Sequence, residues 1–443
     1  MPRRRPREIH RQQGLLTPSW LGYAPWMFLA AHSLLAIAYN LATPFGNNGY
    51  PNTPDEGAHF QYVAYVAQAW RLPRFEGYEG VGYEAHQPPL YYFLAALLYT
   101  LAGGEGKAVR LLSTLCSAGV VWLVWLTLRR LAPERPLVAL AGMGFAAFLP
   151  MHIAIGSAVG NDALTNLLFA ATLYALMVHL QSTSEPPAGE RAESGRTALQ
   201  RTLLPAVLVG LTVLTKATGV LLVPILLLGT IYGARQRSGS WVSGLGAGFL
   251  ALLGTLLVSG WWFLRNYLLY HDPLLQRTFL EVFAGTAKAQ DFLAQGMSWG
   301  QYAQLVADWT FRSFWFAYGV PETARTGLPN FLPDSVYYGL GALAVGAAAG
   351  WVVRPREPLP AWARVWLLLA ALCLLLTLVS FVLFVRVFFQ TQGRYLYPAL
   401  LPLSVFWVMG WERLLPERYQ QPALLGLTGL MLLLALGCMR FLG

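Results

Sequence analysis

The sequence predicts an all-α polytopic membrane protein, and three observations support this prediction. Of the 443 residues, 56% are hydrophobic and only 12% are charged, whereas about 25% are charged in an ordinary soluble domain. The mean hydropathy is positive. Several apolar segments are long enough to cross about 30 Å of hydrocarbon. The net charge of +10 does not indicate nucleic-acid binding, because basic residues in such chains gather in cytoplasmic loops as orientation signals.

Apolar segments of membrane-spanning length recur along the whole chain. We expect spans near residues 23–43, 111–129, 135–152, 162–181, 202–233, 243–264, 334–353, 361–385, 395–413 and 422–440. The segment 202–233 is long enough for two short spans around Lys216, which gives eleven spans in all. The apolar run 88–102 is borderline in length, and we expect it to lie at the outer surface.

The charges of the loops predict the orientation. With 88–102 kept out of the membrane, the basic loops at 129–135, 235–237, 354–356 and 412–418 share one side with the arginine-rich N-terminus. Basic loops mark the cytoplasmic side. This arrangement predicts a plasma-membrane protein with its N-terminus inside and its C-terminus outside. Counting 88–102 as a span would reverse every later orientation.

We expect residues 1–443 to form a single membrane-embedded domain with three notable loops. The first outer loop, 44–110, carries an acidic motif, and the second large outer loop, 267–333, is rich in aromatic residues but too polar to span. The cytoplasmic loop, 182–201, is rich in Ser, Pro and Gly and is predicted to be a surface connection.

Two adjacent acids, Asp55 and Glu56, follow the first predicted span. Thr53 and Glu56 have the spacing of a capping box, and Pro54 suits the first helical position, so a helix is expected to start here. In the simpler interpretation, both acids serve only the end of this helix. His59 favours a functional site instead, because it lies one turn after Asp55 on the same face.

Other unusual polar residues fall on the same outer side in this topology. The predicted site contains Asp55, Glu56, His59, His86, Gln87, Asn161, Asp162, Lys216, Arg265, Asn266, Arg394 and Tyr395. Ionisable groups at membrane depth are costly and normally face a cavity or a partner, so we interpret them as one shared site. Simpler roles exist for several of them. Asn161 could cap a helix, and Lys216, Arg265 and Arg394 could extend to lipid headgroups.

The order and spacing of these motifs resemble the integral-membrane glycosyltransferases of the GT-C fold that use lipid-phosphosugar donors. Protein O-mannosyltransferases and aminoarabinose transferases are examples. The resemblance covers most of the chain and rests on residues 54–60, 86–92, 110–113, 161–162, 216–219, 262–266 and 392–395. It implies a GT-C-like domain with juxtamembrane helices in the first outer loop. In several relatives a lysine precedes the Pro-Pro pair, whereas this chain has Gln87 there, with His86 beside it.

The resemblance also implies a mechanism. Asp55 would be the catalytic acid residue, with Glu56 as its neighbour and basic side chains around the donor phosphate. We hypothesise that ionised Asp55 accepts a proton from an acceptor hydroxyl as the hydroxyl attacks the sugar from the side opposite the phosphate, which inverts the anomeric centre. Lys216, Arg265 and Arg394 are candidates to neutralise the leaving phosphate.

The expected partners are a polyprenyl-phosphate sugar donor, an acceptor glycan, lipid or protein, and membrane lipids. No obligatory cofactor is expected, although Asp55 or Glu56 with Asp162 could hold a divalent metal ion. The three cysteines all fall in apolar stretches and imply neither a zinc site nor a disulfide. Two other classes stay open. The chain could be a lipid or solute transporter, or a non-catalytic glycolipid-binding protein.

Overall fold

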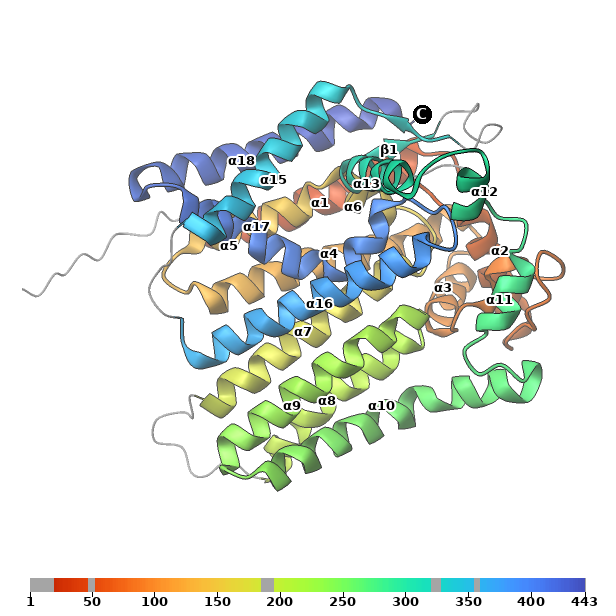
Figure 1. Cartoon of the computed structure of the whole chain (residues 1–443), viewed down its shortest axis with the longest axis horizontal. Coiled ribbons are helices and arrows are strands. Elements are labelled where there is room, and N and C mark those ends of the chain that lie inside the picture. Colours follow the sequence, from red (N-terminus) through yellow and green to blue (C-terminus); the bar gives the residue numbers. More distant parts are fainter. Residues whose placement is uncertain (1–19, 47–51, 185–194, 320–327, 354–358, 443) are drawn as a thin grey trace, which may run out of the picture.

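The computed structural model describes residues 20–46, 52–184, 195–319, 328–353 and 359–442, and within these ranges the chain is almost entirely helical (Figure 1). The first half contains α1 (Trp20–Ala42), α2 (Glu56–Ala69), η1 (Tyr83–His86), α3 (Leu90–Leu101), α4 (Gly106–Leu131), α5 (Pro136–Ala147), α6 (Pro150–Gly156), α7 (Asp162–Ser184) and α8 (Gly195–Val213). The second half contains η2 (Ala217–Leu221), α9 (Leu222–Ser238), α10 (Trp241–Tyr270), α11 (Gln276–Val282), α12 (Ala289–Ala294), α13 (Trp299–Trp315), α15 (Asp334–Val353), α16 (Ala361–Val385), η3 (Gly393–Ala399), α17 (Leu400–Leu414), α18 (Glu417–Cys438) and η4 (Met439–Phe441).

Eight of the described helices are long and apolar enough to cross a membrane, which confirms the polytopic all-α prediction. They are α1, α4, α7, η2 with α9, α10, α15, α16 and α18. The bent pair α5 and α6, with a 60° angle between them, would make nine. The predicted count of eleven is not confirmed. The span expected at the start of 202–233 corresponds to the apolar part of α8, Leu199–Val213, and the span expected at 395–413 corresponds to α17, which has 15 residues. Both are shorter than the 18 residues counted here as enough to span.

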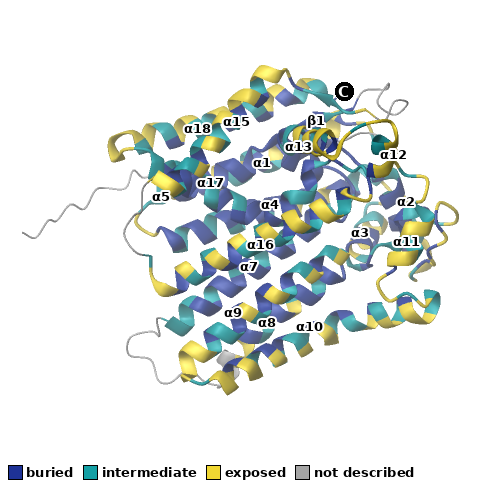
Figure 2. Cartoon of the chain, in the orientation of Figure 1, coloured by how far each residue is buried: buried dark blue, intermediate teal, exposed yellow. Residues whose placement is uncertain are grey.

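The long helices lie side by side and roughly parallel or antiparallel, with α7 in the middle of the bundle (Figure 1). Buried residues line the inside of the bundle, whereas exposed side chains follow the outer faces of α10, α15 and α18 (Figure 2). Many of these exposed side chains are leucine and valine. Exposed apolar faces of this size are unusual in soluble monomers and are expected where helices meet lipid.

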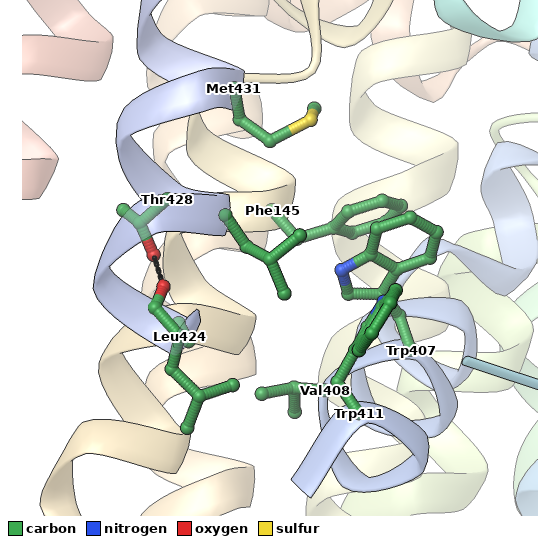
Figure 3. Close-up of a pocket in the computed structure, with 9 residues that line it drawn as sticks. Phe145, Trp407, Val408, Trp411, Leu424, Thr428 and Met431 are labelled. Atoms are coloured by element: carbon green, nitrogen blue, oxygen red, sulfur yellow. Dashed lines mark hydrogen bonds between the residues drawn. The ribbon is translucent and has the colours of Figure 1, made fainter. Parts of the chain in front are cut away.

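Glycine allows one very close helix crossing. A Cβ atom on Gly350 of α15 would lie 1.8 Å from the carbonyl oxygen of Gly410 in α17. Only the absence of side chains lets the two backbones touch in this way, as is common between membrane helices. Nearby, α5, α17 and α18 enclose a small apolar cavity of about 10 Å³, lined by Phe145, Trp407 and Met431 among others (Figure 3). It has room for about one water molecule and lies outside the predicted site.

The short helices α2, α3, α11 and α12 gather at one end of the bundle (Figure 1). In the loop predicted to be the first outer loop, α3 has 12 residues, or about 18 Å, which is less than the thickness of the hydrocarbon. The second loop forms α11, α12 and α13, followed by a two-stranded antiparallel sheet of β1 (Ala317–Tyr318) and β2 (Asn330–Phe331). At the start of α3, the backbone N–H of Leu90 donates to the carbonyl of Leu214, which ties the first loop to the end of α8.

Candidate active site

Asp55 stands at the N-cap of α2 in a left-handed backbone conformation, with φ of 60° and ψ of 14°. Its side chain makes no capping hydrogen bond. The predicted capping box of Thr53 and Glu56 is wrong, because Asp55 is the N-cap and Glu56 is the first helical residue rather than the third. Instead, Oδ1 accepts a hydrogen bond of 2.9 Å from the Tyr83 hydroxyl, and Oδ2 accepts one of 3.2 Å from Nη2 of Arg394. About a third of the Asp55 side chain is exposed. A left-handed non-glycine residue is strained, and such residues concentrate at functional sites.

Glu56, the next residue, is fully buried. Its Oε1 and Oε2 each accept a 2.6 Å hydrogen bond from Arg110, which is itself fully buried in α4. The backbone N–H groups of Gly46 and Val159 donate to the same carboxylate at 2.9 Å. Four donors surround a carboxylate that can accept about four. Glu56 therefore has no free lone pair and acts here as an anchor between α2 and α4.

Arg394 links Asp55 to a second carboxylate. Its guanidinium donates through Nη1 to Oδ2 of Asp162, and Lys216 donates through Nζ to Oδ1 of the same residue. Asp162 is the first residue of α7, where the helix dipole favours a negative charge. The side chain of Arg394 is 5% exposed, against 14% for Asp162 and 18% for Lys216. We call Asp55, Arg394, Asp162 and Lys216 the charged network.

Two glycines let the segments that carry Arg394 and Lys216 pack closely against neighbouring helices. A Cβ atom on Gly393 would lie 2.3 Å from the backbone of Phe314 in α13, so only glycine lets η3 approach this closely. The N–H of Gly393 also donates to the Ser313 hydroxyl at 2.8 Å. On the opposite side, a Cβ atom on Gly219 would lie 2.6 Å from the backbone nitrogen of Val213, where η2 folds back onto α8. The motifs around 392–395 and 216–219 therefore have a steric reason for their glycines.

Tyr395 and Asn161 help to position the cations of the charged network. The ring of Tyr395 has the Lys216 ammonium 5.8 Å and the Arg394 guanidinium 5.0 Å from its centre. Asn161 donates from Nδ2 to the carbonyl of Thr215, immediately before Lys216, and to Oε1 of Gln87, both at 3.1 Å. Asn161 therefore fixes the junction of α7 and α8.

The two predicted histidines, His59 and His86, contact aromatic residues and Glu84 rather than the charged network. Nδ1 of His59 is 2.7 Å from the Tyr92 hydroxyl and 3.7 Å from Oε2 of Glu84. Burial lowers the pKa of His59 and raises the pKa of Glu84, although each group opposes the shift of the other. Both shifts are in the direction of the neutral form. Burial also lowers the pKa of His86 to about 4, and the His86 ring packs against Phe279, 5.2 Å between centroids.

Arg265 and Asn266 have no recorded contact with the charged network. Arg265 donates to the carbonyl of Pro73 at 2.6 Å and stacks near Trp262, while Asn266 donates to the carbonyl of Pro273 at 3.4 Å. The structure therefore brings together all but these two of the predicted site residues, with Glu56 in an anchoring position.

Sequence reasoning missed four residues of this region: Tyr83, Glu84, Tyr92 and Gln392. Gln392 accepts a hydrogen bond of 2.6 Å from Nε of Arg394. Tyr92 and Gln392 lie inside motifs that had been identified, and could have been included with them. Tyr83 and Glu84 precede such a motif by only a few residues, but a tyrosine or glutamate in a loop carries no pattern that distinguishes it.

A groove reaches η3, the segment that carries Arg394, at Leu396. It has a volume of about 420 Å³ and is bounded by α13, the end of α16 and η3. Its lining is mainly apolar and includes Trp299, Tyr302, Phe311, Phe381, Val385 and Leu396. Arg386 lies among them, and Leu396 directly follows Tyr395. Within the described residues, no three His, Cys, Asp or Glu side chains are placed to hold a metal ion.

Comparisons with known proteins agree with this architecture. A family described as dolichyl-phosphate-mannose-protein mannosyltransferase matches residues 86–262. No curated protein matches the chain. The oligosaccharyltransferase of Archaeoglobus fulgidus in its apo form superposes with a TM-score of 0.54 at 13% identity, over 95% of this chain and 56% of its own.

Two further structures are similar. The same archaeal enzyme in complex with an inhibitory peptide and a dolichol-phosphate gives a TM-score of 0.53 at 12% identity, over 96% of this chain. The protein O-mannosyltransferase Pmt1-Pmt2 complex of S. cerevisiae gives 0.39 at 18% identity, over 57% of this chain and 35% of its own. This chain spans 56% of the archaeal enzyme's length in both superpositions. The chain therefore shares its overall fold with the archaeal oligosaccharyltransferase.

Proposed function

We propose that this protein transfers a sugar from a polyprenyl-phosphate donor to an acceptor hydroxyl at the outer face of the plasma membrane. The observation that carries the proposal is the charged network, in which the partly exposed carboxylate of Asp55 contacts Arg394, and Asp162 joins Arg394 to a second cation, Lys216. An apolar groove reaches the same segment of chain at Leu396, two residues after Arg394. A carboxylate base and cations for a phosphate are the two chemical requirements of this reaction.

The groove between α13 and α16 suits the lipid of the donor. Its apolar lining would bury the first part of a polyprenyl chain, and Arg386 would meet a negative charge at its edge. The archaeal oligosaccharyltransferase of the same fold has been determined with a dolichol-phosphate, which supports a lipid phosphate of this class as the ligand.

Arg394 and Lys216 have hydrogen-bond donors left for the phosphate. Three of the five N–H donors of Arg394 are used, by Gln392, Asp162 and Asp55, so two remain without a recorded partner. Lys216 has three N–H donors, and its recorded hydrogen bond to Asp162 uses one. Asp162 would hold the two cations in place while their free donors neutralise the negative charge that grows on the leaving phosphate.

Asp55 acts as the base in this proposal. The acceptor oxygen attacks the anomeric carbon as its proton passes to Asp55, and the bond from that carbon to the phosphate oxygen breaks on the opposite side. The product is therefore inverted. A positioned base typically contributes about 10² to 10⁴ in rate. Arg394 would orient Asp55 by holding Oδ2, which leaves Oδ1 for the proton.

The distribution of charge supports an outward-facing site. The charged network lies where α7 begins and α8 ends, at the end of the bundle that carries α2, α3 and α11 (Figure 1). The arginines at 129–130, 235–237 and 413 end α4, α9 and α17, respectively. Because basic residues favour the cytoplasmic side, the network would face outward.

Turnover of defined donors tests this function. We would incubate the purified protein in liposomes with a panel of polyprenyl-phosphate sugars and measure release of lipid phosphate. Asp55→Asn should lower release by about 10² to 10⁴, because the amide cannot accept the proton, while donor binding persists. Equal release by wild type and Asp55→Asn would remove Asp55 from the base role.

Two further arms complete this experiment. A chelator should not change release if Arg394 and Lys216 supply the positive charge, whereas a loss restored by added divalent metal would show that a metal ion is required. Lipid flipping or solute uptake by the same liposomes, unchanged in Asp55→Asn, would favour a transporter over a transferase.

A further inference from the structure

Tyr83 occupies the place on Asp55 that the proposed reaction reserves for the acceptor. We propose that the Tyr83 hydroxyl fills the acceptor-hydroxyl position while no acceptor is bound, and thereby protects the donor from hydrolysis by water. This inference rests on the proposed function, since it assumes that Asp55 is the base of a sugar transfer.

The contact between Tyr83 and Asp55 has the chemistry of an acceptor bound to its base. The phenol donates to Oδ1 at 2.9 Å, as a substrate hydroxyl would before giving up its proton. Burial and the negative charge of Asp55 both raise the pKa of Tyr83, so the phenol stays protonated and the carboxylate is the acceptor. Without an acceptor, water would otherwise reach Oδ1, because about a third of the Asp55 side chain is exposed.

Of the two groups on Asp55, Tyr83 is the one that can be exchanged. Arg394 is almost fully buried and is held by Asp162 and Gln392 as well as Asp55. Tyr83 is half-buried, and its recorded side-chain hydrogen bond is the one to Asp55. An incoming hydroxyl would therefore displace Tyr83 and leave Arg394 in place.

The backbone before Tyr83 is built from glycines in left-handed conformations. Gly77, Gly80 and Gly82 have φ values of 75°, 64° and 93°. A Cβ atom on Gly82 would also lie 2.6 Å from Oε1 of Gln61. Glycine adopts these conformations without strain and can leave them at little cost. The segment therefore has the freedom to swing Tyr83 away.

Aromatic contacts favour the position in which the Tyr83 hydroxyl is bonded to Asp55. Tyr83 packs against Tyr78, with ring centroids 5.5 Å apart, and against Phe283 just after α11, at 6.1 Å. Such contacts contribute about 0.5–1.5 kcal/mol per pair. They would bring the phenol back to Asp55 after each turnover without preventing its displacement.

The side reaction that Tyr83 would suppress is hydrolysis of the donor. In hydrolysis, the oxygen of water bonds to the anomeric carbon, the bond from that carbon to the phosphate oxygen breaks, and Asp55 takes a proton from the water. A water molecule must compete with Tyr83 on its own, whereas an acceptor is held by additional contacts that raise its effective concentration. Tyr83 would therefore exclude water more effectively than it excludes the acceptor.

The test is donor hydrolysis without acceptor. Using a polyprenyl-phosphate sugar that the wild type cleaves, we would measure free sugar released by the full-length wild type, Tyr83→Phe and Tyr78→Phe. Loss of a hydrogen bond to a charged group shifts an equilibrium by about tenfold or more. Tyr83→Phe should therefore hydrolyse the donor about tenfold faster than wild type. Tyr78→Phe, which keeps its ring and has no recorded bond to Asp55, should match the wild type.

Two further measurements keep the proposal testable. Phe283→Leu loosens the support of the Tyr83 ring, so it should raise hydrolysis in the same direction but by less, and it replaces Tyr83→Phe if that variant does not fold. Mass spectrometry of the peptide that contains Tyr83 should show no added sugar. A sugar on Tyr83 would overturn the guard role, because Tyr83 would then be an acceptor itself.

The remaining outcomes separate two kinds of failure. Hydrolysis that is unchanged or lower in folded Tyr83→Phe would overturn the guard role while leaving the proposed function intact. If the wild type cleaves no donor of the panel, or if Asp55→Asn cleaves it equally well, the proposed function fails first and the guard role fails with it.

Discussion

Asp55 and Glu56 are neighbours in the chain, yet their surroundings differ in almost every physical respect. Glu56 is fully buried, and Arg110 and two backbone N–H groups saturate its oxygens. Asp55 is partly exposed, and its Oδ1 is held by a tyrosine on a glycine-rich segment. One acid is enclosed in a closed ion pair, while the other is the open end of the charged network.

This difference shows how to distinguish structural from chemical carboxylates. A buried ion pair is tolerable only when further hydrogen bonds satisfy it, and its closure leaves nothing with which to bind a ligand. A base needs the opposite, namely an accessible oxygen and a partner that orients it without blocking it. Asp55 with Arg394 meets that requirement, whereas Glu56 with Arg110 does not.

The largest expected effect on stability comes from opening the closed pair. Glu56→Gln would leave the Arg110 charge buried without a counter-ion, and breaking a buried pair typically costs about 3–5 kcal/mol. Chemical unfolding in detergent should therefore show a large loss for Glu56→Gln. The double variant Glu56→Gln with Arg110→Met should recover part of it.

An exposed pair provides the matched control for this experiment. Arg277 and Glu281 of α11 are both about 70% exposed, so Glu281→Gln should change the free energy of unfolding by no more than about 0.5 kcal/mol. If Glu56→Gln destabilised the protein as little as Glu281→Gln does, the closed pair would not be an anchor.

The next effect concerns the open network. Arg394→Ala should weaken donor binding by about 10- to 100-fold, because two charge-assisted hydrogen bonds to the phosphate would be lost. Arg394→Lys keeps the charge but not the planar fork, and should fall between Arg394→Ala and wild type. Binding of a fluorescent polyprenyl-phosphate sugar measures both variants.

Arg265 provides the control for the donor-binding experiment with Arg394. It was predicted from the sequence to meet the phosphate, but it donates to the carbonyl of Pro73 and has no recorded contact with the charged network. Arg265→Ala should therefore weaken donor binding less than Arg394→Ala does. The reverse order would mean that the phosphate lies near Arg265 and that the charged network has another role.

The sequence predicts the membrane class, most span positions and all four residues of the charged network, because those features rest on local patterns. Length and hydropathy identify α1, α10 and α16 directly. The different roles of Asp55 and Glu56 could not be predicted, since they depend on Arg110, 54 residues away. Tyr83 was missed for the same reason, as its partner is fixed by the folding of a loop. The count of eleven spans depended on dividing the apolar run 202–233 in two and on taking 395–413 as a full span, and apolar composition alone does not fix where a helix begins and ends.

The smallest expected effect is a pH dependence of stability. The pKa of the half-buried His86 falls from 6.5 to about 4, mainly because its ring is desolvated. Between pH 6.5 and 4 the unfolded chain binds a proton on His86 that the folded chain does not, so stability is lost as the pH falls through this window. His86→Gln should reduce this loss in thermal unfolding measured from pH 7 to 4.

The control for this effect is the exposed His271, which has a left-handed backbone conformation. Asparagine tolerates that conformation, so His271→Asn tests an exposed histidine without adding backbone strain. An acid sensitivity that is equal in His86→Gln and wild type would show that burial of His86 does not contribute to it.

The most direct test of the account compares Asp55→Asn and Glu56→Gln side by side, as lipid-phosphate release per folded molecule from a donor that the wild type cleaves. We predict that Asp55→Asn keeps wild-type stability and loses about 10² to 10⁴ in rate, whereas folded Glu56→Gln retains most of its turnover and loses stability. Full release by Asp55→Asn, or inactivity of well-folded Glu56→Gln, would contradict the division of roles between these two acids.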